Sequence, residues 1–191
     1  LLCREWRLPL ECRYLYGSRR AWRLALYHRD PQRAVGQLCA GPEVIPAAVL
    51  EGAGLAPGER REVLFRLGIS GEEPLPLEQR EGFSLALLEC SLFRELLDSR
   101  SRWALPLLLG YLSQEGLLEG DSWALVDSGW MGTTQETLSE TLSLLGGPGK
   151  VRGLYAGLYR APQRGAWDAC FFRPGRELGV QARFEPSLWE A

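Results

Sequence analysis

The positions of apolar residues along the chain predict helices and strands that follow one another. Leucines recur at helical spacing over residues 78–97, which predicts a largely buried helix, and a second helix is expected over residues 103–114. The leucines that define the first of these helices are Leu85, Leu88, Leu92 and Leu96. Further upstream, residues 13–17 (RYLYG) are aromatic and end in glycine, a pattern typical of a short strand.

The second half of the chain adds three strands, over residues 122–126, 151–159 and 169–172. A helix over residues 133–145 follows the first of them, because its leucines fall on one face and a Gly-Gly-Pro-Gly segment ends it. Strands separated by helices need right-handed crossovers. We therefore expect an α/β fold with a mainly parallel sheet, Rossmann-like or phosphoribosyltransferase-like, flanked by helices.

Turn-forming residues refine this picture at two places. The Pro- and Gly-containing turn at residues 161–165 predicts a β-hairpin at the C-terminal edge of the sheet. Glycine and proline also recur over residues 41–76, which predicts short helices such as residues 59–67 in a small helical insertion, while Pro31 is expected to start a helix.

The length of 191 residues requires no second domain, so we expect a single α/β domain over residues 1–191. The chain opens on LLCREW without an initiator methionine, so we expect it to be a piece of a longer protein.

Composition narrows the classes of partner. The net charge of -2 gives no overall attraction to nucleic acid or to an acidic membrane. The most apolar run, residues 103–112, is about half as long as a membrane span. The five cysteines are too far apart to form a CxxC pair, which fits a reducing cytoplasm. A cytoplasmic protein without membrane or nucleic-acid partners is therefore expected.

The segment WALVDSGWMGTTQETL, residues 123–138, carries the strongest indication of function. A strand is expected to end in Asp127, and hydroxyls and open backbone amides follow it before a helix begins. The candidate ligand-binding residues of this loop are Asp127, Ser128, Gly129, Gly132, Thr133 and Thr134. Such a loop suits a phosphate, and a carboxylate beside it could hold sugar hydroxyls or a Mg²⁺ carried with the ligand.

A purely structural interpretation covers part of this loop. Thr133 and Glu136 have the spacing of a capping box, which closes a helix N-terminus without any ligand. That device leaves Asp127, Ser128 and the two glycines unexplained.

The first predicted strand leads to Ser18 and Arg19, which we expect at the same edge of the sheet as Asp127. A guanidinium there could bind phosphate with two parallel hydrogen bonds, although a solvated helix start explains the same residues equally well. Trp22 and Trp130 lie near the two loops, and either could stack on a sugar or base or pack in the interior.

Two resemblances follow from these residues. ALVDSGWMGTTQETL resembles the ribose-phosphate loop of type I phosphoribosyltransferases, with Ser128 in place of the usual second acidic residue and a loop one residue shorter. The resemblance implies that Asp127 holds ribose hydroxyls and that residues 132–134 hold the 5'-phosphate.

YLYGSRRAW, VDSGWMGTTQ and VRGLYAGLY together resemble a region found after haloacid-dehalogenase-like domains in large bacterial proteins, some of them associated with glycosyltransferases. The strand ending in Arg-Asp-Gly that usually precedes the SRR segment in that family is missing, and so is the phosphatase's Asp-x-Asp motif. The resemblance therefore implies a setting in bacterial glycan or nucleotide-sugar metabolism, without assigning phosphatase chemistry.

Three functional hypotheses remain open at this point. The first is binding of a phosphorylated sugar or nucleotide, with catalysis and catalytic residues undetermined. The second is a non-catalytic interaction module that packs on a fused phosphatase-like or glycosyltransferase domain. The third is a hydrolase in which His28, the single histidine, serves Ser128 or Asp127 as a base.

Overall fold

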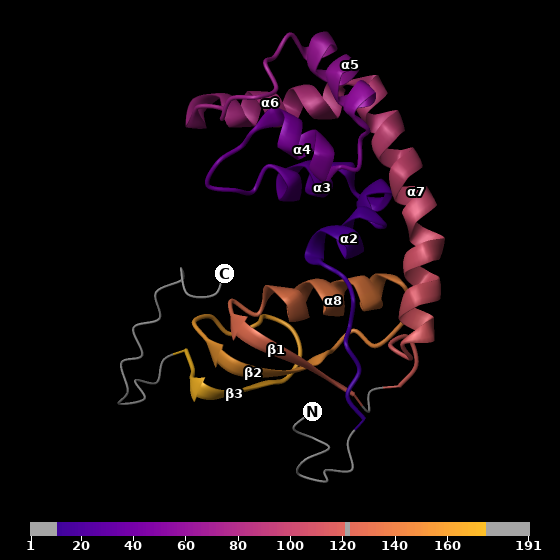
Figure 1. Cartoon of the computed structure of the whole chain (residues 1–191), viewed down its shortest axis with the longest axis vertical. Helices are drawn as coiled ribbons and strands as arrows, with labels where there is room; N and C mark the ends of the chain where they lie inside the picture. Colours follow the sequence, from indigo (N-terminus) through magenta and orange to yellow (C-terminus); the bar gives the residue numbers. More distant parts are fainter. Residues whose placement is uncertain (1–10, 121–122, 175–191) are drawn as a thin grey trace. The chain divides into compact units, whose positions relative to one another are not determined.

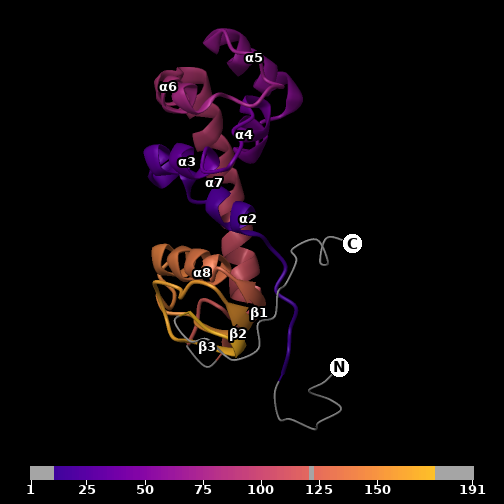
Figure 2. The same cartoon turned by 90° about the vertical axis from the view of Figure 1, so that its left-hand side faces the viewer.

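The computed structural model describes residues 11–120 and 123–174, which fall into two compact units divided between Leu105 and Pro106. The first unit is built from helices, and the second combines a sheet with a helix (Figures 1 and 2). The sequence predicted one domain, whereas the described residues form two units, each with a buried cluster of its own.

The first unit is held together by short helices around one apolar core. Its helices are α2 (Arg19–Leu24), the 3-10 helix η1 (Tyr27–Arg29), α3 (Pro31–Leu38), α4 (Pro46–Gly52), α5 (Pro57–Leu67), α6 (Leu77–Glu89) and most of α7 (Ser91–Gln114). Pro31 begins α3 as predicted, because its missing N–H costs nothing in the first turn and the Asp30 carboxylate accepts a hydrogen bond from the backbone N–H of Arg33.

Residues 41–76 contribute to the core of this unit. The predicted helix over residues 59–67 is confirmed as α5, which ends at Gly68 in a left-handed conformation. Val44, Leu50 and Val63 are fully buried and belong to the same cluster as Phe93 and Leu97 of α7. The segment is therefore helical as expected, but it is part of the core of the first unit.

Two sequence-based predictions that involve the first unit are wrong: a strand and the point where one helix ends and the next begins. Residues 13–17 were predicted as a strand and lie in neither helix nor strand, since aromatic content indicated β propensity without supplying a paired neighbour. The helices expected over residues 78–97 and 103–114 are instead α6 and α7, separated at Cys90, whose ψ of 107° is extended. Leucine periodicity continues across this break, so the pattern alone could not locate it.

Helix α7 carries the chain across the division between the two units without interruption (Figure 1). Pro106 lies inside this helix, directly after the division. Proline has no backbone N–H, so the carbonyl of Arg102 has no helical donor at that turn.

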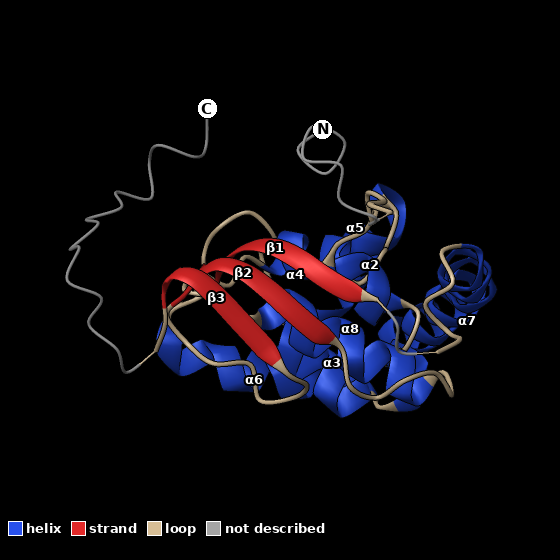
Figure 3. Ribbon diagram, turned by 90° about the horizontal axis from the view of Figure 1, so that it is seen from below, coloured by secondary structure: helices blue, strands red, loops and turns tan. Residues whose placement is uncertain are grey.

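The second unit confirms the α/β fold with a mainly parallel sheet. Its elements are β1 (Ala124–Trp130), α8 (Thr133–Leu144), β2 (Arg152–Leu158) and β3 (Trp167–Phe172). The strands lie in the order β1-β2-β3 and all pairs are parallel (Figure 3). Helix α8 covers one face of this sheet and buries Leu138 and Leu142 (Figures 2 and 3).

The predicted C-terminal hairpin is wrong, because β2 and β3 are parallel. The chain returns between them through residues 159–166. Eight extended residues reach about 26 Å, which is enough to run back beside a strand of about 23 Å. Proline and glycine in this segment signalled a tight turn, but they serve a longer return loop.

The side chain of Gln135 fixes the place where β2 and β3 begin. Its amide nitrogen donates to the carbonyls of Val151, Arg164 and Ala166 at 2.8, 3.0 and 3.1 Å. Its oxygen accepts a 2.7 Å hydrogen bond from the hydroxyl of Tyr155. Gln135 is fully buried, so these contacts replace the water that the side chain loses on folding.

The other face of the sheet is exposed in the part of the chain that the structure describes. Val126 of β1 is 76% exposed and Leu154 of β2 is 38% exposed. Parallel sheets are usually covered on both faces, so this exposed apolar face is unusual.

Among the described residues, no helix is long and apolar enough to cross a membrane.

Replacing Gln135 by leucine should destabilise the second unit strongly, because three carbonyls and one hydroxyl lose their buried partner. We expect the free energy of unfolding to fall by roughly 2–5 kcal/mol, measured by urea denaturation. Tyr155→Phe removes a single hydrogen bond and should cost only about 1 kcal/mol. An equal loss of unfolding free energy in the two variants would contradict a central role of the Gln135 side-chain amide in the stability of the second unit.

Candidate functional site

Asp127 lies within β1 rather than after it. The strand continues to Trp130, and Asp127 is paired in register with Tyr155 of β2. Residues opposite one another share a face, so Asp127 and the buried Tyr155 both lie on the face that packs against α8. The Asp127 carboxylate accepts a 3.2 Å hydrogen bond from the backbone of Gly129. The expectation of a strand ending at Asp127 is therefore corrected by three residues.

This correction separates the predicted loop residues. Ser128 follows Asp127 in the strand and is exposed on the opposite face, because strand side chains alternate. Gly129 is paired with Gly157, and a Cβ at Gly129 would clash with the Gly157 carbonyl. Ser128 and Asp127 consequently cannot act together on one ligand from the same side of the sheet.

Gly132, Thr133 and Thr134 do lie together, at the start of α8. Gly132 is the N-cap residue, with a left-handed φ of 64°, and a Cβ at this position would clash with the ring of Pro162. The predicted capping box is wrong, because Gly132 precedes the helix and the carboxylate of Glu136 binds elsewhere.

Ser18 and Arg19 belong to the first unit. Ser18 is the N-cap of α2, and its hydroxyl accepts a 3.2 Å hydrogen bond from the backbone of Ala21. Arg19 is the first residue of that helix. The alternative interpretation as a helix start is therefore confirmed for Ser18, while a site shared with Asp127 stays a prediction.

Two other candidates in the first unit have structural surroundings. Trp22 is 2% exposed and its ring lies against Gly17, so it has no face available for a ligand. The Nδ1 atom of His28 is 2.8 Å from the hydroxyl of Ser101, a fully buried residue. His28 thus has a hydrogen-bond partner within the first unit, whereas Ser128 and Asp127 belong to the second.

Three aromatic side chains meet at the C-terminal ends of the strands, one from each strand end. Trp130 ends β1, Tyr159 follows β2 and Phe172 ends β3, and we call this group the aromatic stack. The Trp130 ring lies 5.6 Å from Tyr159 and 5.8 Å from Phe172, and the last two rings are 4.9 Å apart. Gly157 makes room for Phe172, since a Cβ there would clash with the ring. Tyr159 is 59% exposed, so one side of the stack is open to solvent.

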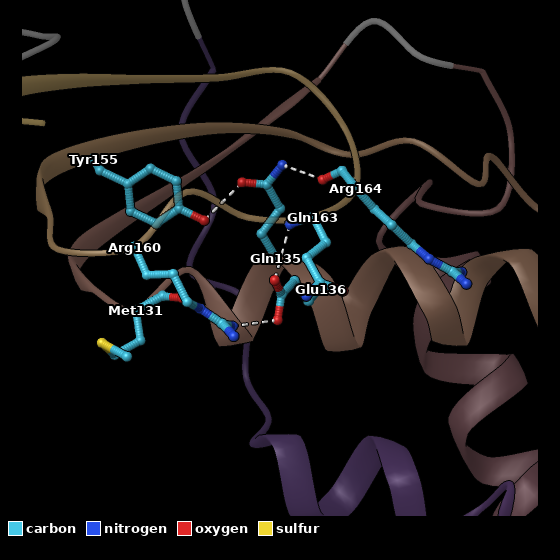
Figure 4. A network of polar contacts seen from close by, with 7 residues as sticks. All are labelled: Met131, Gln135, Glu136, Tyr155, Arg160, Gln163 and Arg164. Atoms are coloured by element: carbon cyan, nitrogen blue, oxygen red, sulfur yellow. Dashed lines mark hydrogen bonds and ion pairs between the residues drawn. The ribbon is translucent and has the colours of Figure 1, made fainter. Parts of the chain in front are cut away.

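A charged group lies at the first turn of α8 (Figure 4) and includes Arg160, the residue after Tyr159 of the aromatic stack. The Glu136 carboxylate accepts from the Arg160 guanidinium at 2.8 Å and from the backbone N–H of Gln163 at 2.9 Å. We call Glu136, Arg160 and Gln163 the Glu136 clasp. It fastens the loop between β2 and β3 to α8, next to the Gln135 contacts that hold the far end of that loop.

The electrostatic environment favours a neutral phenol at Tyr155. Burial raises the pKa of Tyr155 well above its usual range, and the carboxylates of Asp127 and Glu136 raise it further. Among the residues that the structure describes, no three histidine, cysteine, aspartate or glutamate side chains gather to bind a metal ion. The Mg²⁺ site at Asp127 stays a prediction.

Sequence reasoning missed several residues of this site. Trp130 was considered for stacking, but Tyr159 and Phe172 were not, although each stands at the end of a predicted strand. Comparing the last residues of the three strands would have revealed the group. Both partners of Glu136, and two of the four partners of Gln135, lie in the loop between β2 and β3, where the sequence predicted a hairpin turn over residues 161–165, and no sequence signal marked these contacts.

The raised pKa of Tyr155 makes stability sensitive to alkaline pH. The neutral phenol stabilises the folded state below about pH 10, the pKa of an unfolded tyrosine, and this contribution is lost as the pH rises further. By pH 11.5 the wild type should lose about 2 kcal/mol that Tyr155→Phe retains.

Urea midpoints at pH 8 and pH 11.5 would measure this difference. The variant should be less stable than the wild type at pH 8, and the gap should close or reverse at pH 11.5. A gap that is the same at both pH values would contradict this assignment.

Comparisons with protein-family models, with curated proteins and with solved structures found no match for this chain. The resemblances to phosphoribosyltransferases and to the region beside haloacid-dehalogenase-like domains therefore stay predictions from the sequence.

Proposed function

We propose that the second unit binds a phosphorylated sugar or nucleotide at the C-terminal ends of its strands. The aromatic stack carries this proposal, because it gathers one ring from each strand end and leaves Tyr159 largely exposed. Sugar and base rings stack on such surfaces. In open parallel sheets, ligands bind at this same edge.

The backbone of Trp130 supports the proposal. Trp130 has a φ of 84°, and it is the one non-glycine residue with a positive φ among those described. A bulky residue in this region is strained, and such strain gathers at functional sites where the surroundings hold it in place. The ring of this residue is the one that contacts Tyr159 and Phe172.

Polar groups suited to the rest of the ligand lie next to the rings. Arg160 follows Tyr159 directly and could bind a phosphate, and the N-terminal end of α8 favours negative charge. Asp127 would hold sugar hydroxyls, or a Mg²⁺ that accompanies the phosphate. Ser128 has no part in this arrangement, since it lies on the other face.

The setting follows from the sequence resemblances. We place this binding function in the cytoplasm, in a longer bacterial protein of glycan or nucleotide-sugar metabolism, with a Rossmann-like or phosphoribosyltransferase-like sheet. No reaction is assigned, because the described site contains no arrangement of nucleophile and base.

A second candidate function is a non-catalytic module that packs on a fused phosphatase-like or glycosyltransferase domain. The observation that favours it is the exposed sheet face with Val126 and Leu154, since parallel sheets are normally covered on both faces. This function and ligand binding use different surfaces of the second unit. Absence of binding by any compound in the experiments below would favour the module.

Removing the Trp130 ring should weaken ligand binding. A thermal-shift screen with phosphoribosyl pyrophosphate, nucleoside monophosphates, nucleotide-sugars and sugar phosphates, with and without Mg²⁺, would identify a ligand. Stacking on an aromatic ring contributes about 1–3 kcal/mol, so Trp130→Ala should raise the Kd by roughly 5- to 150-fold in calorimetric titration.

Trp103→Ala is the matched control for this experiment, because Trp103 is an exposed tryptophan of the first unit. Tyr159→Ala tests the same surface at an exposed position, where a loss of folding is not expected. Unchanged affinity in both Trp130→Ala and Tyr159→Ala would rule out the aromatic stack as the binding surface.

Asp127→Ala should abolish the binding of ligands with sugar hydroxyls while the protein stays folded, because the Asp127 carboxylate accepts a local hydrogen bond, from the backbone of Gly129 in the same strand. The melting temperature without ligand should change little, and the ligand-induced increase should disappear. A full ligand-induced increase in this variant would remove Asp127 from the site.

A further inference from the structure

The Glu136 clasp has the composition of an anion site that is already occupied. The guanidinium of Arg160 and the backbone N–H of Gln163 converge on a single carboxylate, each on a different oxygen, at 2.8 and 2.9 Å (Figure 4). A guanidinium and a backbone amide are the donors with which proteins bind phosphate and carboxylate ligands.

The Glu136 carboxylate is not needed to cap its own helix. Gly132 is the N-cap residue of α8, and both carboxylate oxygens are directed to the loop between β2 and β3. Gln135 separately holds that loop through Arg164 and Ala166. The loop therefore has a second attachment if the Glu136 carboxylate moves away.

The clasp is also positioned to be opened by a ligand. The side chain of Arg160 is 44% exposed and that of Glu136 is 23% exposed, so solvent weakens their ion pair. A phosphate carries up to two negative charges and binds a guanidinium through two oxygens, so it can compete with a carboxylate.

The location links the clasp to the aromatic stack. Arg160 follows Tyr159 in the sequence, and its guanidinium lies 3.4 Å from the carbonyl of Met131, the residue after Trp130. A ring on the stack and a phosphate on Arg160 would thus belong to one ligand.

We infer that the Arg160 guanidinium and the backbone N–H of Gln163 form the phosphate subsite of the second unit. The Glu136 carboxylate occupies this subsite until a phosphate displaces it. Glu136 is then a built-in competitor that lowers the affinity for the anionic part of the ligand. This inference rests on the proposed function for the identity of the complete ligand, but the subsite itself can be tested with inorganic phosphate.

Glu136→Gln is the decisive variant. The substituted glutamine keeps an oxygen that can accept from the backbone N–H of Gln163. It removes the negative charge that holds Arg160. Inorganic phosphate should bind this variant roughly tenfold more tightly than the wild type, because a like charge no longer faces the anion. Calorimetric titration at constant ionic strength would measure the affinities.

Arg160→Gln and Glu119→Gln complete the experiment. Adding Arg160→Gln to Glu136→Gln should abolish the gain in phosphate affinity. Glu119→Gln makes the same change in net charge in the second unit, next to Leu118, which lies against Gly147 beyond the other end of α8. It should leave the affinity unchanged. Circular dichroism would verify that all variants are folded.

The outcomes separate this inference from the proposed function. Equal phosphate affinity in the wild type and Glu136→Gln, or an equal gain in Glu119→Gln, would overturn the inference. A sugar phosphate or nucleotide that binds the wild type through Trp130 would still uphold the proposed function in that case. Tighter phosphate binding that depends on Arg160, without any ligand that depends on Trp130, would uphold the subsite and refute the proposed function.

Discussion

The buried amide of Gln135 is the interaction on which the arrangement of the second unit depends. Parallel strands cannot be aligned by a tight turn, because each must begin at the same edge of the sheet. Gln135 solves this problem with one side chain from α8, which binds the carbonyl before β2 and the carbonyls before β3. The strand starts are thus fixed relative to the helix, and with them the positions where the strands end.

The strand ends depend on this alignment because every strand has a definite length. Trp130, Tyr159 and Phe172 meet at the other edge of the sheet, after a shift of one residue in the β2–β3 register between Tyr155 and Gly157. The glycine pair Gly129 and Gly157 contributes at the far end, where the strands leave no space for side chains. The buried contacts of Gln135 at the strand starts therefore help to set the positions of the three aromatic rings at the strand ends.

Much of the fold could be predicted from the sequence, and the errors have definite physical causes. Leucine spacing located α8, short apolar and aromatic runs located β2 and β3, and proline and glycine indicated α3 and α5. Periodicity cannot detect the helix break at Cys90, because the leucine spacing of α6 continues into α7. Periodicity also gives no strand direction, so residues 161–165 were interpreted as a hairpin turn although they belong to a loop that returns the chain to a parallel strand.

The site could be predicted only in part, because a site depends on which face and which edge a residue occupies. Asp127 and Ser128 are adjacent in sequence, yet strand alternation directs them to opposite faces. The Glu136 clasp joins positions separated by more than twenty residues, and this pairing exists only once the return loop has been placed.

Helix α7 has a practical consequence for dissecting the molecule. The two units meet inside a helix, so a cut between Leu105 and Pro106 leaves two new helix ends that differ in chemistry. A fragment that starts near Pro106 would have proline in its first helical turn, where the missing N–H costs nothing. A fragment that ends at Leu105 would carry a last turn of carbonyls without donors, and it would fray from that end. A cut at this position therefore disturbs the helix end of a second-unit fragment less than that of a first-unit fragment.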